Sequence, residues 1–320
     1  FSRHSSLQID CDRVLQGTFT RDIDRQNFEI MRVFQRQKYS VPRRYFELAR
    51  RTGMQPLGYC RMAHLRAPPP YHCYGSRLYD RHPEYRCVDI GGAPVSRLSI
   101  AFPEVRREFL KLFTEQVEMG AAGINNVFVR GLPMVLYEGP VRRRFRERYG
   151  GDMTRRPEND PRAQKVRAEF MTVFLREQRA ALDRAAGGHA TIMATVPSNR
   201  RVCDFFGLNI RTWVREKLVD VLCPYRFGTN GEHEKLDLDF YCREVKGSGV
   251  KLLPHIRTWS DDLPRMLAHA LEYSRWPIDG FSVWDASTID QQSRIAVAGL
   301  GTKAGIRQAM RALKDPPHHR

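Results

Sequence analysis

The sequence predicts an α/β protein, and we favour a (β/α)8 barrel of the TIM type over a doubly wound open sheet. Short apolar runs alternate with longer amphipathic segments, and most runs are apolar on both faces, as in parallel strands covered by helices. No G-x-G-x-x-G and no P-loop follows any run, which disfavours a nucleotide-binding open sheet. Seven strands are predicted where a barrel needs eight, so we expect a first strand to be missing or to lie upstream of residue 1.

Each strand is predicted from a short apolar run bounded by polar or turn-forming residues. The first run, LQIDCDRVL, places Asp10 and Asp12 two residues apart and therefore on one face of a strand. We expect these carboxylates to pair with arginines at the ends of neighbouring strands. The predicted strands cover residues 7–15, 55–60, 123–129, 190–196, 219–225, 250–256 and 279–286.

The segments between the runs are predicted to be helices. Residues 41–53 have a proline near the start and a glycine at the end, which is the usual order of these residues in a helix. Residues 103–120 carry apolar side chains at close to a 3.6-residue period. The other predicted helices cover residues 160–188, which is long enough for an interruption, 209–218, 236–249, 262–276 and 301–313.

A single domain is predicted for residues 1–320, because no tandem repeat and no long linker divides the chain. Residues 64–103 form a long excursion after the second predicted strand, and this excursion is rich in proline, tyrosine and histidine. Excursions of this length within compact domains are commonly functional. We therefore expect residues 64–103 to lie near a site.

The chain is strongly basic, with 53 lysines and arginines against 36 acidic residues and a formal net charge of +17. This charge favours a polyanionic partner such as a nucleic acid or an acidic polysaccharide, unless it reflects only the base composition of the genome. The arginines are spread along the chain, so no specific nucleic-acid partner is expected. In residues 141–150, the spacing of Val141, Phe145 and Tyr149 predicts a short helix with arginines on its solvent side.

No apolar run of about 18 residues occurs, so no membrane span is predicted. The first residues lack the basic and apolar parts of a secretory signal. The location is therefore periplasmic, secreted or lipoprotein-anchored if a signal has been removed, and cytoplasmic otherwise.

The 7 cysteines lack a C-x-x-C spacing, which predicts buried thiols rather than a zinc site. Cys73 and Cys87 are the exception, because they lie in a predicted loop. The oligomeric state is not predictable from these patterns.

Two carboxylates at strand ends are predicted to be catalytic. Glu138 follows the third predicted strand and Asp285 ends the seventh, and barrel chemistry takes place at the carboxyl ends of the strands. Paired carboxylates suit glycoside cleavage, in which one protonates the leaving oxygen and the other attacks or activates water. Two alternatives stay open: Glu138 bonds nearby arginines, or Asp285 caps the next helix.

Substrate-binding residues are predicted at the same rim. Sugar rings stack on aromatic side chains, and an arginine that leaves a buried strand requires an anionic partner. The histidines of this rim could instead be hydrogen-bonded residues without a role in the reaction. No H-x-H or H-E-x-x-H motif occurs, so we predict no metal and no cofactor. The predicted substrate-binding residues are Arg61, His64, Arg130, Tyr137, Tyr225, His255, Trp259 and Trp284.

The stretch YDRHPEYRCVDIGGAPVSRLSIAFPEVRREFLKLFTEQVEMGAAGINNVFVRG resembles a segment of the bacterial glycosyl-hydrolase-like, family 10 glycosidase-like proteins. The elements that carry the resemblance are the H-P-E triplet at 82–84, the P-E-V-R helix start at 103–106, and Gly123, Ile124, Phe128 and Arg130. The similarity in order extends over residues 41–287. It implies a (β/α)8 barrel that acts on a polysaccharide, with a first strand just upstream.

One position departs from the pattern of these proteins. Many of them end the third strand with an aspartate, where this chain has Val127. Two functions therefore stay open: a glycoside hydrolase acting on a polysaccharide or oligosaccharide, for which the basic charge favours an anionic one, or a carbohydrate-binding barrel that has lost catalysis.

Overall fold

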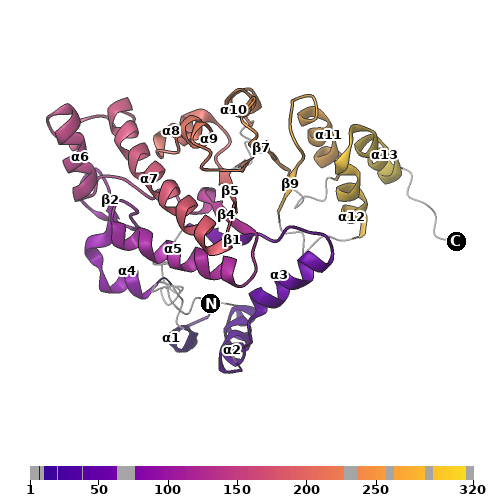
Figure 1. Ribbon diagram of the computed structural model, residues 1–320, viewed down its shortest axis with the longest axis horizontal. Helices are drawn as coiled ribbons and strands as arrows, with labels where there is room; N and C mark the ends of the chain where they lie inside the picture. The colour runs from indigo at the N-terminus through magenta and orange to yellow at the C-terminus, as the bar shows by residue number, and fades with distance from the viewer. Residues whose placement is uncertain are drawn as a thin grey trace.

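The structure is a computed structural model, and it describes residue 7 and residues 11–19, 21–37, 39–62, 76–226, 236–256, 263–284 and 291–314. Helices surround a central parallel sheet (Figure 1). Short 3-10 helices are η2 (Pro83–Tyr85), η3 (Phe128–Arg130), η4 (Met153–Arg155) and η6 (Gly299–Gly301). The α-helices are α1 (Cys11–Leu15), α2 (Asp22–Arg36), α3 (Val41–Arg51), α4 (Arg77–Arg81), α5 (Pro103–Glu118), α6 (Gly139–Tyr149), α7 (Pro161–Ala186), α8 (Arg200–Phe205), α9 (Ile210–Arg215), α10 (Leu238–Val245), α11 (Leu263–Tyr273), α12 (Gln291–Ala298) and α13 (Lys303–Lys314).

The central sheet has five parallel strands whose spatial order follows the chain. They are β1 (Gly58–Arg61), β4 (Gly123–Val127), β5 (Thr191–Val196), β6 (Val221–Pro224) and β7 (Lys251–Leu252). A second parallel pair, β8 (His255–Ile256) and β9 (Ser282–Val283), continues this series, because the Asp279 amide donates to the Leu252 carbonyl at 3.0 Å. The described strands show no reversal of order of the kind that marks a doubly wound sheet.

The sheet is strongly curved. The rings of Tyr59 on β1 and Trp284, directly after β9, have centroids 6.4 Å apart. In a flat sheet, five strand spacings would separate these two strands by about 24 Å. The described strands nevertheless show no hydrogen-bonded pairing of β1 with β9. The face that carries both rings is therefore the concave one.

The convex face of the sheet packs against helices and forms the main core. Ile124, Ile192 and Leu222 point from neighbouring strands into this core and are fully buried. Phe174 of α7 contacts Phe109 of α5 with ring centroids 5.8 Å apart, so the two helices pack through aromatic side chains. Burial of this kind stabilises by roughly 1.5–3 kcal/mol per large side chain, which makes the α5–α7 layer the main support of the strands.

Gly123 begins β4 because the next strand passes very close. A Cβ atom at this position would lie 1.9 Å from the Thr191 carbonyl oxygen of β5. A larger residue would push the two strands apart, so a glycine is required here for the strand pairing that follows.

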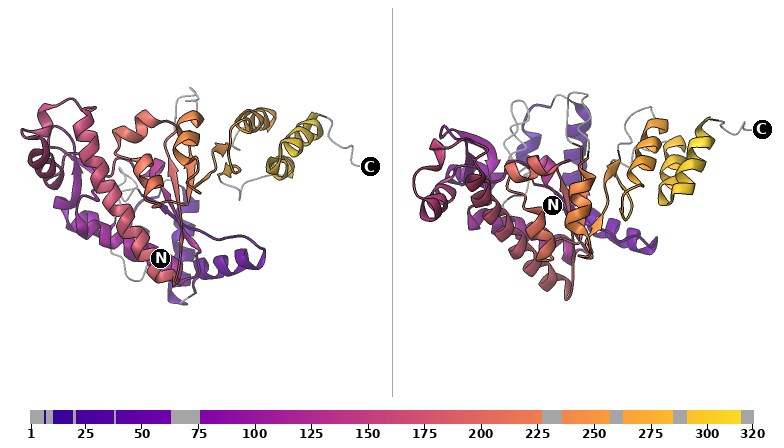
Figure 2. Two further views of the ribbon diagram at one scale, coloured as in Figure 1. Left: turned by 45° about the horizontal axis from the view of Figure 1, so that its top comes forward. Right: turned by 90° about the horizontal axis from the view of Figure 1, so that it is seen from above.

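The C-terminal helices form a second, smaller core. Leu267, Ala270 and Tyr273 of α11 are buried against residues of α12 and α13, and Ile256 joins them from β8. In Figure 2 these helices lie at one end of the molecule, beyond β9. Among the described residues, no helix combines the length and the hydropathy required to cross a membrane.

Six of the seven predicted strands are confirmed, and the one at residues 7–15 is wrong. Residues 11–15 form α1 instead, because Cys11 and Val14 are three residues apart and both pack in a small core with Phe28 of α2. Asp12 lies 3.9 Å from Arg32 and not beside an arginine of the strand ends. The predicted helices are confirmed, including the one at residues 141–150, and α7 is uninterrupted.

The described part of the excursion at residues 64–103 carries a small antiparallel hairpin. Its strands are β2 (Arg86–Val88) and β3 (Pro94–Leu98), and α4 and η2 precede it. Cys87 of β2 is fully buried, so it does not form the predicted exception; it and the other described cysteines are buried free thiols. Cys73 lies outside the described residues.

Candidate ligand-binding site

The carboxyl ends of the strands bring a group of aromatic side chains together on the concave face. Tyr225 follows β6 and stacks on His255 of β8, with ring centroids 4.2 Å apart and an interplanar angle of 26°. Trp284 meets Tyr225 edge to face at 4.8 Å. Tyr59 of β1 also meets Trp284 edge to face, with an interplanar angle of 89°. We call these four residues the aromatic wall.

The aromatic wall has a buried base and an accessible top. Tyr225 and His255 are less than one tenth exposed, whereas Tyr59 is 46% exposed and Trp284 is half-buried. Val127 and Val129 complete an apolar cluster with Tyr225 and Trp284. An apolar platform of rings with one accessible face can bind a flat or ring-shaped ligand.

Two arginines lie beside the wall. The guanidinium carbon of Arg130 lies 5.7 Å from the centroid of the Trp284 ring. Arg61 donates from Nε to the hydroxyl oxygen of Tyr59 at 3.1 Å. No carboxylate oxygen lies within 4.0 Å of either guanidinium in the described part of the chain. A third arginine, Arg226, packs on the Tyr273 ring and donates to its hydroxyl group.

The concave face below the wall is polar but unreactive. Thr195 Oγ1 donates to Asn125 Oδ1 at 3.0 Å, which links β5 to β4. The side chains of Thr195 and of Ser282 of β9 favour the thiolate of Cys223 on β6, but burial outweighs them. Burial raises the pKa of the Cys223 thiol to about 11, so this sulfur is a neutral thiol at neutral pH and not a nucleophile.

Glu138 is not part of this group. Its side chain is 1% exposed, and its two oxygens accept from the Leu136 amide at 3.1 and 3.0 Å and from the Val88 amide at 3.2 Å. Burial raises the pKa of this carboxyl, and the backbone hydrogen bonds oppose that rise. The carboxylate thus joins the loop before α6 to the β2–β3 hairpin. In Figure 1, α6 and β2 lie on the side of the molecule opposite β9.

Tyr137 is also removed from the wall. It is 3% exposed within the main core, and the guanidinium carbon of Arg167 lies 5.7 Å from the centroid of its ring. Both residues therefore support the loop that precedes α6. Neither Tyr137 nor Glu138 presents an accessible atom to a ligand at the strand ends.

The structure brings together five of the predicted site residues and separates two. His64, Trp259 and Asp285 lie outside the described residues. Sequence reasoning missed Tyr59, which was treated as part of a buried run. The signal was its two-residue spacing from Arg61, since alternate residues of a strand share a face. The residues brought together are Arg61, Arg130, Tyr225, His255 and Trp284.

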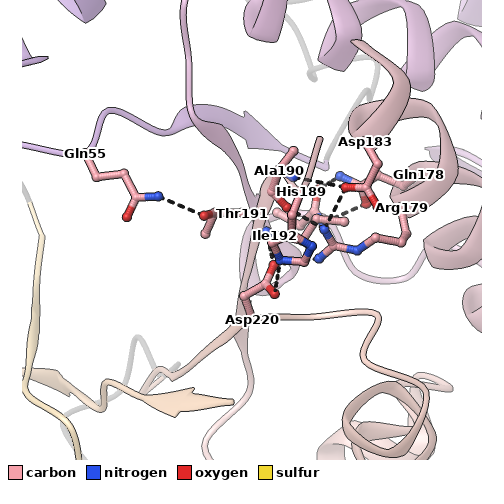
Figure 3. A network of polar contacts seen from close by, with 10 residues as sticks. Gln55, Gln178, Arg179, Asp183, His189, Ala190, Thr191, Ile192 and Asp220 are labelled. Carbon is pink, nitrogen blue, oxygen red and sulfur yellow. Dashed lines mark hydrogen bonds and ion pairs between the residues drawn. The ribbon is translucent and has the colours of Figure 1, made fainter. Parts of the chain in front are cut away.

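The opposite ends of the strands hold a different polar group, shown in Figure 3. Asp220, just before β6, accepts from the Ile192 amide at 2.7 Å and from Arg179 of α7, and it lies 2.7 Å from His189. Arg179 also donates to Asp183 at 3.1 Å. These contacts join α7 to the starts of β5 and β6. We call this group the amino-end network, and each charge in it has an opposite charge beside it.

No group of three or more histidine, cysteine or acidic side chains suitable for a metal ion occurs among the described residues. No protein-family model matches the chain, and no curated protein matches it either. The site is therefore interpreted from its own residues.

Proposed function

We propose that the chain is a (β/α)8-type barrel. Three observations support this. The described strands are parallel and follow one another in chain order. Helices cover the convex face. The sheet curves until Tyr59 of the first strand touches Trp284 after the last one. A single direction of winding with this curvature is the arrangement that barrel closure requires.

The ligand we propose for this barrel is a polysaccharide or oligosaccharide bound at the carboxyl ends of the strands. The observation that carries the proposal is the aromatic wall, in which Trp284 offers an indole face flanked by Tyr59 and Tyr225. Sugars present C–H faces that pack on such rings, and polar groups at the edge fix their orientation. The resemblance to family 10 glycosidase-like proteins supports the same ligand class.

Two functions are candidates: carbohydrate binding, and hydrolysis in which Glu138 and Asp285 act as the pair of carboxylates. Carbohydrate binding has the better support. Glu138 is committed to backbone amides in the loop before α6, and Val127 stands where related sequences carry an aspartate. Hydrolysis remains the second candidate because Asp285 follows Trp284 directly in the sequence. In glycoside hydrolases the acid, base and nucleophile are carboxylates at the substrate site, so Asp285 stays a candidate on its sequence position alone.

The test is binding and turnover of a panel of oligosaccharides by the full chain. We expect at least one glycan to bind and Trp284→Ala to weaken it by about 10- to 100-fold, as loss of a central aromatic contact does. Release of reducing sugar, abolished in Asp285→Asn and retained in Glu138→Gln, would support hydrolysis. Binding without release would support the non-catalytic barrel. Absence of glycan binding, or full affinity in Trp284→Ala, would contradict the proposed function.

A further inference from the structure

Arg61 and Arg130 lie at the carboxyl ends of neighbouring strands without a carboxylate partner among the described residues, and we propose that they bind an oxyanion carried by the glycan. This inference rests on the proposed function and narrows the ligand to an acidic polysaccharide or oligosaccharide. The shared chemistry is a carboxylate or sulfate group on a sugar ring.

Each of the two guanidinium groups contacts a ring of the aromatic wall. Arg61 of β1 lies opposite Val127 of β4 in the strand register, and Arg130 comes three residues after Val127. Arg130 packs on the indole of Trp284 at 5.7 Å. Arg61 is tied to the Tyr59 hydroxyl, and the Tyr59 ring in turn contacts Trp284. Both cations therefore flank the platform on which the sugar is proposed to stack.

Two arginines on the helices that pack against the sheet show what a partnered guanidinium looks like in this protein. Arg106 of α5 binds both oxygens of Glu177 at 2.7 and 2.9 Å, and Arg176 of α7 binds Glu216 in the same way at 2.7 and 2.8 Å. The Nε atom of Arg130 is buried and has no hydrogen-bond partner among the described residues. A desolvated guanidinium donor without an acceptor is unfavourable. The Nε atoms of Arg167, Arg179 and Arg226 are buried in the same way, so this atom does not set Arg130 apart. The Nη groups of Arg130 are not among the buried, unpartnered atoms, and they are the donors proposed for an incoming oxyanion.

An acidic sugar matches both parts of this arrangement. The guanidinium fork binds a carboxylate or sulfate through two parallel hydrogen bonds, which fixes direction as well as charge. The ring that carries the anion offers C–H groups to the wall. A neutral sugar uses the wall alone. The arginines therefore determine specificity, whereas the aromatic residues bind sugars of either kind.

The experiment compares acidic oligosaccharides with neutral counterparts of the same linkage. The neutral counterparts of oligogalacturonate and oligoalginate are made by reduction of their carboxyl groups. A chondroitin sulfate fragment is compared with its desulfated form, which keeps only carboxylates, and with a form that is both desulfated and carboxyl-reduced and is therefore neutral. Calorimetric titration of the full chain should show at least one acidic form binding about 10- to 100-fold more tightly than its counterpart, the range expected for hydrogen bonds to a charged group. Preference for the uronates identifies carboxylate, and preference that is lost on desulfation identifies sulfate.

Variants assign the preference to the two arginines. Arg130→Ala and Arg61→Ala should each reduce it about tenfold, and Arg130→Lys should retain part of it, because lysine keeps the charge without the fork. Arg143→Ala is the matched control. Arg143 is exposed on α6 and has no carboxylate partner among the described residues, so its loss removes the same charge far from the wall.

Each contrary result has a separate meaning. Equal binding of acidic and neutral forms, with Trp284→Ala still weakening both, overturns the inference and leaves the proposed function intact. A preference that survives in the Arg61→Ala, Arg130→Ala double variant also overturns it. Binding of no glycan overturns the proposed function together with the inference. Single-stranded DNA tests for a response to overall charge. If it binds tightly, and its affinity falls as much in Arg143→Ala as in Arg130→Ala, the preference for acidic ligands reflects overall charge and the inference is overturned.

Discussion

Arginines at the two ends of the parallel sheet have opposite surroundings. In the amino-end network, Arg179 donates to Asp183, to Asp220 and to the Ala190 carbonyl (Figure 3). At the carboxyl end, Arg130 packs on Trp284 with no carboxylate beside it in the described chain. The first arginine uses its donors to hold α7 against β5 and β6. The second has no such acceptor among the described residues and is the one proposed to bind the glycan. The acceptor, and not the side chain itself, decides whether an arginine stabilises the fold or binds a ligand.

Removing the acceptor of the amino-end network should produce the largest loss of stability. Asp220→Ala removes the carboxylate that accepts from the Ile192 amide and takes one of three acceptors from Arg179, so we expect the free energy of unfolding to fall by about 3 kcal/mol. Chemical denaturation followed by circular dichroism measures this change. As a control, Asp239→Ala breaks a pair with Arg243 that is exposed on α10 and should cost less than about 0.5 kcal/mol. Equal losses of unfolding free energy in Asp220→Ala and Asp239→Ala would mean that the amino-end network contributes no more stability than an exposed ion pair.

Glu138→Gln tests whether the buried carboxylate near α6 belongs with the partnered, structural groups. The new amide NH2 would face the Leu136 or Val88 N–H, both of which now donate to the carboxylate. We expect a loss of about 2 kcal/mol in unfolding free energy, with glycan affinity unchanged. Lost turnover at unchanged stability would place Glu138 in the reaction instead.

Asp160 extends the comparison to the helix layer. Its side chain caps α7 by accepting from the Arg162 amide at 2.8 Å, and the hydrogen bond from the Arg162 side chain lowers the pKa of Asp160 to about 2. We expect Asp160→Ala to cost about 1 kcal/mol at pH 6.

The pH dependence of this variant has a defined sign. Because the folded-state pKa of Asp160 is below its ordinary value of 3.8, the stabilisation is present above pH 3.8 and is lost as the pH falls toward 2. The stability difference between wild type and Asp160→Ala should therefore shrink between pH 4 and pH 2, with Asp160→Asn as the capping control. A constant difference over this range would show that the charge contributes nothing.

Arg130→Ala should have the smallest effect on stability. Arg130 forms no ion pair among the described residues, so we expect a change within about 0.5 kcal/mol, measured against Arg179→Ala in the same denaturation assay. The loss of the indole contact is the main contribution. A cost equal to that of Arg179→Ala would mean that Arg130 is a structural residue, and the contrast between the two ends of the sheet would not hold.

Most helices and strands could be predicted from the sequence, because the periodicity of apolar residues and the length of an apolar run are local properties of the chain. Strand β5 and helix α5, for example, follow directly from an apolar run and from a 3.6-residue period. The failure at residues 7–15 has the same origin. Cys11 and Val14 are apolar residues in a short run, and the choice of helix over strand there depends on packing against Phe28.

The candidate site was predictable in part. Tyr225, His255 and Trp284 converge because parallel strands end at one rim, and this follows from topology alone. Glu138 could not be placed, because its orientation depends on the β2–β3 hairpin, whose contact with residues 136–138 is not encoded in any local pattern. The loop position indicated a reactive group, whereas the backbone amides around it give it a structural role.

Tyr59 and Trp284 come from distant parts of the chain, so the platform they share cannot exist until β9 docks. Contacts of such long sequence separation form slowly. A nascent chain with β1 to β7 already paired would carry both rim arginines but no indole between them. The proposed glycan platform therefore requires β9 to be docked. A local opening of β9 would abolish it while the five-stranded sheet stays intact.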